Sequence, residues 1–314
     1  MADELARAAR LLREGRLVAF PTETVYGLGA DASSAAAVAR LYAAKRRPLD
    51  HPVIVHFAAA EDAFAWAREV PQAARKLATT FWPGPLTLIL KRSPKAGDFV
   101  TGGQDTVGLR VPSHPVAQAL LREFRGPIAA PSANRFGEVS ATTAAHVRED
   151  LAAEADLVLE GGQSDIGIES TIVELSGGKA VLLRPGHIGA SELEAALGEK
   201  LAERPAGAPR HSGGLERHYA PRTRAQLVAP HELDAQISKW LAQGSEVAVL
   251  AFSRPDQRVD FWLRMPQDPV AYAQKLYAAL RELDGAGCAR ILIETPPQDE
   301  RWAAVGDRLR RAAA

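Results

Sequence analysis

The sequence predicts a mixed α/β protein that is built from two domains. The chain has 314 residues, which is enough for roughly two domains. Helix-like and strand-like patterns alternate along it, but several strand patterns follow one another directly. A window rich in glycine and proline, residues 203–222, separates two such series. We therefore expect a twisted mixed sheet with packed helices in residues 1–202, a linker over 203–222, and a smaller α/β domain in 223–314.

Local signals set the elements of the first domain. Asp3 can cap a first helix that ends near Gly15, and Ser33 or Ser34 can cap a second helix that stops at Pro48. Further helices are expected over 60–69, 72–81, 114–124, 142–151 and 191–201. The expected strands are 17–20, 52–57, 86–90, 106–111, 128–130, 157–159, 170–175 and 180–183.

The second domain has a Rossmann-like pattern. Its expected strands are 225–229, 247–252, 260–264 and 290–293, and its expected helices are 231–243, 270–284 and 301–312. No Gly-x-Gly-x-x-Gly turn follows the first of these strands, which argues against a dinucleotide site there.

Composition excludes several classes of protein. Lys plus Arg and Asp plus Glu are both 38, so the formal net charge is zero and any contact with nucleic acid must be local. Cys288 is the one cysteine, which excludes an internal disulfide and a cysteine-based metal cluster. No apolar run reaches the roughly 18 residues of a membrane span, and the acidic N-terminus is unlike a signal peptide. The expected compartment is the cytoplasm or an organelle interior.

The residues from Leu17 to Asp31 form the stretch around which the first domain is organised. A buried strand, 17–20, ends at Pro21, and Thr22, Glu23 and Thr24 follow at once. Polar groups at the carboxyl end of a strand lie where ligands bind in open α/β sheets. Gly27 and Gly29 are expected to allow a sharp turn or a close approach to a ligand, although a plain polar loop is equally compatible with these residues.

Three further sites carry charged or polar groups that suit a ligand with phosphate or carboxylate groups. Lys45 and Arg47 either complement a helix end or bind phosphate. Thr106 and Arg110 share one strand face, where Arg110 could bind a carboxylate, or could simply be exposed. Ser132 and Asn134 offer a hydroxyl and an amide at a strand end, suited to phosphate or ribose or to an Asx-type turn.

These motifs together resemble the YrdC-like family of threonylcarbamoyl-AMP synthases, in its longer branch of two domains. The stretch 17–31 is similar to the first family signature, and Trp82-Pro83-Gly84-Pro85-Leu86-Thr87 to the second, which we interpret as a rigid corner. The matching segments, in order, are Lys45-x-Arg47, Ser132-x-Asn134, Glu169-Ser170-Thr171, Arg184-Pro185-Gly186 and His218-Tyr219-Ala220-Pro221. The resemblance implies a YrdC-like fold for the mixed sheet.

The resemblance also implies roles for individual residues. Lys45 and Arg47 would be catalytic. The threonine site would contain Thr22, His56, Arg110 and Ser170, although a lone histidine on a strand is more often a core residue. The nucleotide site would contain Lys45, Arg47, Thr106, Ser132, Asn134, Ser140, Arg184 and Tyr219. Tyr219 lies in the linker, which in this branch folds back over the active site.

The implied reaction joins L-threonine, bicarbonate or CO2, and ATP into threonylcarbamoyl-AMP and pyrophosphate. Mg²⁺ would accompany ATP, held largely by phosphates and waters, because the sequence shows no carboxylate cage and Glu23 is at most an indirect partner. The product would pass to tRNA threonylcarbamoyl-transferase proteins for modification of the adenosine beside the anticodon. The resemblance leaves a weak contact with tRNA open and implies no membrane partner.

The sequence leaves two rival classes of function. An RNA-binding module for tRNA or double-stranded RNA, acting without ATP chemistry, is the alternative, but zero net charge and sparse aromatics disfavour it. A carbamoyltransferase maturation enzyme with a YrdC-like module would carry zinc-finger cysteines, which one cysteine excludes.

Overall fold

The computed structural model describes residues 2–314, which divide into two compact units. The first unit runs to Phe136 and continues over Ala141–Gly214, and the second contains Gly137–Ser140 and Leu215–Ala314. The segment expected to be a linker, 203–222, is thus divided between the two units. No helix in residues 2–314 is long and apolar enough to cross a membrane.

The first unit contains the expected alternation of helices and strands. Its helices are α1 (Ala2–Arg13), α2 (Ala35–Lys45), α3 (Ala60–Phe64), α4 (Gln72–Phe81), α5 (Asp98–Thr101), α6 (Pro115–Phe124), α7 (Ala144–Leu151) and α8 (Ala190–Leu197). Its strands are β1 (Val18–Phe20), β2 (Gly27–Asp31), β3 (Ile54–His56), β4 (Leu86–Lys91), β5 (Thr106–Arg110), β6 (Ile128–Ala129), β7 (Leu157–Val158), β8 (Thr171–Glu174) and β9 (Val181–Arg184). Ser34, not Ser33, caps α2.

Within the described residues, nine strands form one mixed sheet in the order β7-β1-β2-β6-β3-β5-β4-β8-β9. The pairs β1–β7, β3–β5 and β4–β8 are parallel, and the other neighbours are antiparallel. The expectation of a mixed sheet is confirmed. A central strand such as β5 is hydrogen-bonded on both sides, which fixes its side chains in register with those of β3 and β4.

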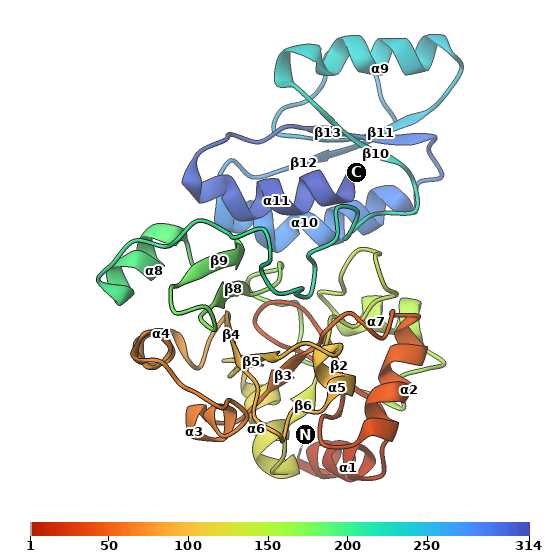
Figure 1. Ribbon diagram of the computed structural model, residues 1–314. Coiled ribbons are helices and arrows are strands. Elements are labelled where there is room, and N and C mark those ends of the chain that lie inside the picture. The colour runs from red at the N-terminus through yellow and green to blue at the C-terminus, as the bar shows by residue number, and fades with distance from the viewer. Residues whose placement is uncertain (1) are drawn as a thin grey trace. The chain divides into compact units, whose positions relative to one another are not determined.

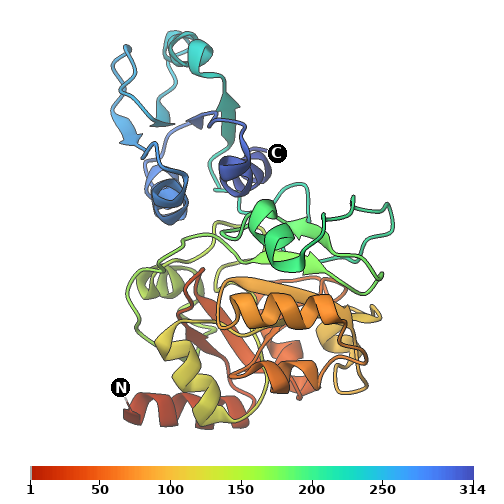
Figure 2. The same ribbon diagram turned by 90° about the vertical axis from the view of Figure 1, so that its left-hand side faces the viewer.

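Alternate side chains of the strands enter cores on opposite faces of this sheet. Leu17 and Ala19 join the larger core under the helices of one face, whereas Val18 and Phe20 join a core formed with α1 and α6. Figure 2 shows α1 and α6 side by side against the sheet. Farther along that second face no helix covers Ile54, and it packs instead with the segment around Ala208. The functional side chains lie on this part of the sheet.

The two glycines of the first signature do not make a turn. Gly27 and Gly29 lie within β2, paired with Phe20 and Val18 of β1. A Cβ atom on Gly29 would come within 2.9 Å of the side chains of Phe20 and Ile128. The prediction of a sharp turn is therefore wrong. The two glycines lack side chains at the place where the Phe20 ring packs against β2.

The second unit is a small parallel α/β domain, as expected. Its elements are β10 (Ala225–Val228), α9 (Leu233–Ala242), β11 (Val247–Ala251), β12 (Phe261–Arg264), α10 (Pro269–Asp284), β13 (Arg290–Glu294) and α11 (Ala303–Ala312). The strands described in it are all parallel, in the order β10-β13-β11-β12. Figure 1 shows α9 on one face of this sheet and α10 and α11 on the other.

Candidate functional site

Three neighbouring strands of the first unit place polar side chains in one row. His56 of β3 pairs with Arg110 of β5, and Arg110 pairs with Thr87 of β4. Residues in register on adjacent strands point to the same face, so the imidazole, guanidinium and hydroxyl lie next to one another. All three side chains are buried. The next row on the same face contains Ile54, Gly108 and Ile89, which are apolar or small.

Arg110 is held by the polar residues that follow β1. Its Nη2 atom lies 2.8 Å from Oε1 of Glu23, and both side chains are about 95% buried. Its Nη1 atom donates to Oγ1 of Thr24 at 2.9 Å, and the hydroxyls of Thr24 and Thr22 are 2.9 Å apart. The Thr22 hydroxyl also donates to the carbonyl of Val25. This network fixes the guanidinium, whose Nε atom is buried without a hydrogen-bond partner in the described residues.

His56 is buried in a neutral form. Burial, followed by the positive charge of Arg110, lowers the pKa of its imidazole to about 3. The ring packs edge-on against Phe20, with 6.3 Å between the ring centres. Its Nδ1 atom is buried and has no hydrogen-bond partner among residues 2–314. Buried polar atoms are nearly always paired, so this atom is available to a bound ligand.

Ser170 connects the row to Arg184. The hydroxyls of Ser170 and Thr87 are 2.8 Å apart. Arg184 donates from Nε to the carbonyl of Ser170 at 3.0 Å and from Nη2 to its hydroxyl at 3.1 Å. Thr22 and Arg110, and separately Ser170 and Arg184, are thus brought into hydrogen-bonded groups, with Thr87 contributing to the second group.

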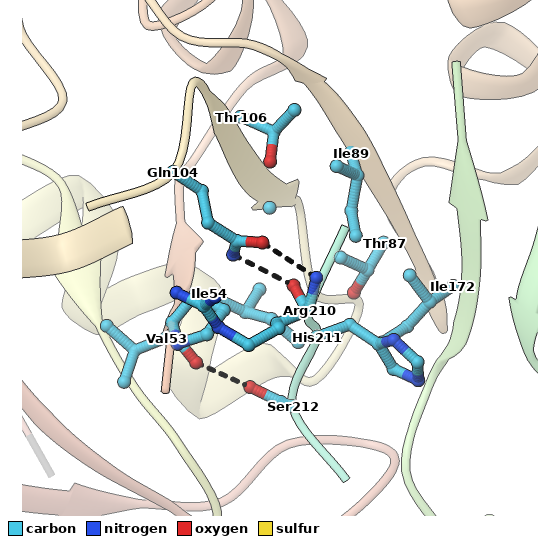
Figure 3. A pocket seen from close by; sticks show the side chains of 12 residues that line it. Val53, Ile54, Thr87, Ile89, Gln104, Thr106, Ile172, Arg210, His211 and Ser212 are labelled. Atoms are coloured by element: carbon cyan, nitrogen blue, oxygen red, sulfur yellow. Dashed lines mark hydrogen bonds between the residues drawn. The ribbon is translucent and has the colours of Figure 1, made fainter. Parts of the chain in front are cut away.

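Ser212 contacts two of the arginines that the sequence marks as site residues, Arg47 and Arg184. Nη1 of Arg184 donates to its carbonyl oxygen at 2.8 Å, and Nη2 of Arg47 lies 3.4 Å from its hydroxyl. The hydroxyl itself donates to the carbonyl of Pro52 at 3.0 Å, the same carbonyl that accepts from Arg47 at 2.7 Å. Figure 3 shows Ser212 and its neighbours lying over the strands.

The segment that contains Ser212 fills the hollow above β3, β4 and β5. Arg210 and Gln104 bond reciprocally, through N–H to Oε1 at 2.7 Å and Nε2–H to the carbonyl at 3.0 Å (Figure 3). Thr106 lines the cavity that remains, together with His211 and Ile172. That cavity is about 20 Å³, which is hardly more than the space of one water.

Lys45 is bound to the loop that carries Ser132 and Asn134. Its ammonium donates to the carbonyl of Ser132 at 2.5 Å and to the carbonyl of Asn134. The loop continues from β6, and Asn134 donates from Nδ2 to the carbonyl of Arg135. The structure therefore places Lys45, Ser132 and Asn134 together, as the paired motifs of the sequence imply, with the lysine almost completely buried.

Two of the expected nucleotide residues lie in the second unit. Arg281 donates to the main-chain carbonyls of Val139 and Ser140. Tyr219 adopts a left-handed backbone conformation, with φ of 57°, and its buried ring packs 5.9 Å from Tyr277 and under the guanidinium of Arg308. Within its own unit, Tyr219 is therefore a core residue.

Sequence reasoning assigned no role to three residues that the structure brings into these networks. Thr24 and Thr87 are both in segments that the sequence marked as signatures, so their side-chain hydroxyls were a usable signal. Ser212 has no such signal, because its contribution to Arg184 is a main-chain carbonyl. Glu23, expected only as an indirect partner, is the direct ion-pair partner of Arg110.

A dedicated metal site is absent from residues 2–314. No group of three or more His, Cys, Asp or Glu side chains in that range could hold a metal ion. Glu23 is occupied by Arg110. The polar side chains of the site are instead hydroxyls, amides and cations. Such groups bind phosphate oxygens, so they fit a metal ion whose ligands are the phosphates and waters.

Comparison with protein families assigns both parts of the chain. The family described as "Telomere recombination" (Sua5/YciO/YrdC) matches residues 10–186. The family described as "Threonylcarbamoyl-AMP synthase, C-terminal domain" matches residues 188–314.

Full-length relatives agree with these matches. The threonylcarbamoyl-AMP synthase of Pyrococcus abyssi is 39% identical over 98% of this chain and 93% of its own length. That of Bacillus subtilis is 39% identical over 99% and 93%. The crystal structure of P. abyssi Sua5 complexed with L-threonine superposes with a TM-score of 0.93, covering 98% of this chain and 94% of that one at 39% identity. The chain therefore belongs to the threonylcarbamoyl-AMP synthase family of enzymes.

Proposed function

We propose that this chain catalyses the formation of threonylcarbamoyl-AMP and pyrophosphate from L-threonine, bicarbonate or CO2, and ATP. The observation that carries the proposal is the row of His56, Arg110 and Thr87, which adjoins Ser170 and Arg184 on one sheet face. This sheet face combines Arg110, which could bind a carboxylate, with Arg184, which could bind phosphate. The chain also superposes over 98% of its length with the threonine complex of P. abyssi Sua5.

The proposed threonine site is built around Arg110. Its guanidinium would bind the threonine carboxylate, since Glu23 and Thr24 already fix its orientation. The unpaired Nδ1 atom of His56 and the hydroxyl of Ser170 are available to the ammonium or hydroxyl of the ligand. Thr22 acts through Thr24 and is a positioning residue in this proposal.

The proposed nucleotide site uses the remaining cations. Arg47 and Arg184 would bind phosphate oxygens in place of the carbonyls that they now contact. Lys45 would contribute its charge from the loop of Ser132 and Asn134. The predicted nucleotide contact of Thr106 is part of the same proposal, whereas those of Ser140 and Tyr219, which lie in the second unit, stay predictions from the sequence.

The chemistry needs no covalent enzyme nucleophile. The amine of threonine captures CO2 as a carbamate and releases a proton, or reacts with bicarbonate and releases water. A carbamate oxygen then attacks the α-phosphorus of ATP, and pyrophosphate leaves. In this proposal Arg110 and His56 orient the amino acid, while Lys45, Arg47 and Arg184 neutralise charge that develops on the phosphates. Mg²⁺ bound to ATP would add further charge neutralisation.

The product is an activated carbamoyl group, so an acceptor must follow. We propose that it passes to tRNA threonylcarbamoyl-transferase proteins in the cytoplasm, for modification of the adenosine beside the anticodon, with at most a weak and local contact to tRNA. A formal net charge of zero supports handing the product to a protein over binding tRNA directly.

Pyrophosphate release tests the proposal. The purified chain is supplied with ATP and bicarbonate, and each amino acid is added in turn. We expect release that requires bicarbonate and threonine, together with a product of the mass of threonylcarbamoyl-AMP. Release that is independent of threonine would contradict the proposal.

A further inference from the structure

The second unit has a cleft at the carboxyl ends of its parallel strands. Its volume is about 740 Å³, within the range of small-molecule sites. Residues directly after β10, β11 and β13 line it, among them Pro230, Phe252 and Thr295. All lining residues belong to the second unit, so the cleft is distinct from the site described above.

The cleft lies at the point in the sheet where the connections from two neighbouring strands leave to opposite sides. β13 and β11 are neighbours in the sheet, but β13 leads to α11, which packs on β10, whereas β11 leads to β12 on its other side. Because the two connections leave in opposite directions, a crevice opens between the ends of the strands. In open α/β sheets this is the position where ligands bind.

A buried carboxylate spans that crevice. Glu294, the last residue of β13, is 9% exposed and lines the cleft. Its Oε2 atom accepts a hydrogen bond of 2.7 Å from the main-chain N–H of Phe252, directly after β11. Each carboxylate oxygen has two lone pairs, so this bond leaves acceptor capacity on both oxygens. The other acid of the cleft, Asp299, lies 3.4 Å from Arg301 and caps the following turn.

The walls of the cleft suit a flat ring. Phe252 is half-buried and packs against Trp302 and Tyr272, with ring centres 5.6 Å apart in both pairs. Pro230, Pro296 and Pro297 add apolar surface and no N–H donors. Arg301 is the one cation among the lining residues, and it is paired with Asp299, so the lining favours a base or nucleoside over a nucleotide.

We propose that this cleft binds a guanine-type ring, which presents two adjacent N–H donors to the carboxylate of Glu294. Guanine has its N1–H and N2–H groups on one edge, so both can bond to the two oxygens of one carboxylate. Adenine has an acceptor at N1 beside its amino group, and that acceptor would face a carboxylate oxygen. The carboxylate therefore discriminates between the two purines.

Calorimetric titration of the full chain with guanosine tests the site, with saturating ATP and no threonine present so that the first unit is occupied. We expect saturable binding of guanosine and at least about 10-fold weaker binding of adenosine and of 1-methylguanosine, each of which lacks the N1–H donor. Equal binding of the three nucleosides, or no saturable binding of guanosine at millimolar concentration, would overturn the proposal.

The variant Glu294→Gln provides the second arm. The amide oxygen of glutamine can still accept the hydrogen bond from the N–H of Phe252, so the fold is preserved. The amide NH2 group, however, would face one of the two guanine N–H donors, and two donors cannot bond to each other. We expect guanosine to bind at least about 10-fold more weakly and adenosine more tightly, because a glutamine amide matches the adenine edge. Glu246→Gln, an exposed glutamate of the same unit, is the matched control and should bind as the wild type does.

Pyrophosphate release by Glu294→Gln keeps the two proposals apart. It should equal that of the wild type, whether or not guanosine binding changes. Unchanged guanosine affinity in Glu294→Gln would show that the nucleoside binds elsewhere and would overturn the assignment of this cleft.

Discussion

The main-chain carbonyl oxygen of Ser212 lies 2.8 Å from Nη1 of Arg184, on a guanidinium whose other nitrogens bond to Ser170. A carbonyl oxygen there satisfies the same donor that would bind a phosphate oxygen. If Arg184 binds ATP, as we propose, the segment around Ser212 must move before the triphosphate can enter. The small size of the cavity beneath it, about 20 Å³, leads to the same conclusion.

Weakening this segment should therefore ease the entry of ATP. The variant Ser212→Ala loses the hydroxyl that bonds to Pro52 and contacts Arg47. We expect the Kd for ATP, measured by titration without threonine, to fall about 2- to 10-fold, since a net hydrogen bond contributes about 0.5–1.5 kcal/mol. Ser113→Ala, at an exposed serine of the same unit, should leave the Kd unchanged. Weaker ATP binding in Ser212→Ala would show that Ser212 is a ligand contact.

Removal of the phosphate cations should reduce turnover. We expect Lys45→Ala and Arg184→Ala to lower the rate of pyrophosphate release at least about 10²-fold, as for loss of a transition-state charge partner. Lys45→Ala also leaves two buried carbonyls without their donor, so its thermal unfolding must be measured alongside. Arg184→Lys keeps the charge but not the planar fork, and Arg122→Ala, on the exposed side of α6, is the control. Full activity in folded Arg184→Ala would exclude the proposed role.

Most of the fold could be predicted because the elements carry local signals. Apolar periodicity, caps and prolines placed the long helices and strands to within a few residues. Exceptions are the short helix α5, which no expected element covers, and β2, since Gly27 and Gly29 are typical of turns. Their place in the sheet depends on the Phe20 ring of β1, which packs against both glycines. This is a contact between two strands, so the local sequence of β2 carries no signal of it.

The candidate site could be predicted only in part, for the same reason. Side-chain functional groups in marked motifs, such as Arg110 and Ser170, lie in the networks described above. The role of Ser212 depends on a backbone atom that comes near Arg184 only after the chain has folded back by 28 residues. The resemblance implies that the linker 203–222, which contains Ser212, folds back over the site, but no residue type indicates which backbone atom makes this contact.

The proposed threonine site should select against smaller and less polar amino acids. The hydroxyls of Ser170 and Thr87 lie beside apolar Ile54 and Ile89, so a ligand with both a hydroxyl and a methyl group uses both surfaces. Relative to threonine, serine lacks the methyl group and should have a kcat/KM about 10- to 100-fold lower. Valine lacks the hydroxyl, and its kcat/KM should be lower still. Pyrophosphate release with each amino acid measures this, and equal kcat/KM values would contradict the site.

The buried imidazole of His56 should make stability depend on pH. Its pKa is about 3 in the folded chain and near 6.5 when unfolded, so between these values the unfolded state binds more protons. The free energy of unfolding therefore falls as the pH drops through this window, by about 2 kcal/mol from pH 7 to pH 5 for this group. The difference between wild type and His56→Gln in urea unfolding should shrink by that amount. His187→Gln, at an exposed histidine, is the control variant.

The length of the first folding unit can be measured by truncation. Residues 203–214 lie in the first unit, where Ala202 and Ala208 cover Ile54 and Ile172 of the sheet. A fragment of residues 1–201 loses this cover, whereas a fragment of residues 1–214 keeps it.

We expect the fragment 1–214 to be more stable than 1–201 by at least about 2 kcal/mol in urea unfolding, because the shorter fragment exposes apolar surface and loses the hydrogen bonds of Arg210 and Ser212. Under the proposed function both fragments should bind ATP, and 1–201 should bind it more tightly, since it lacks the Ser212 carbonyl that contacts Arg184. Both should release threonylcarbamoyl-AMP faster than the full chain, as expected if the linker shields the adenylate from water. Equal unfolding free energies for the two fragments would place the end of the folding unit before residue 202 and remove the basis for a covering segment.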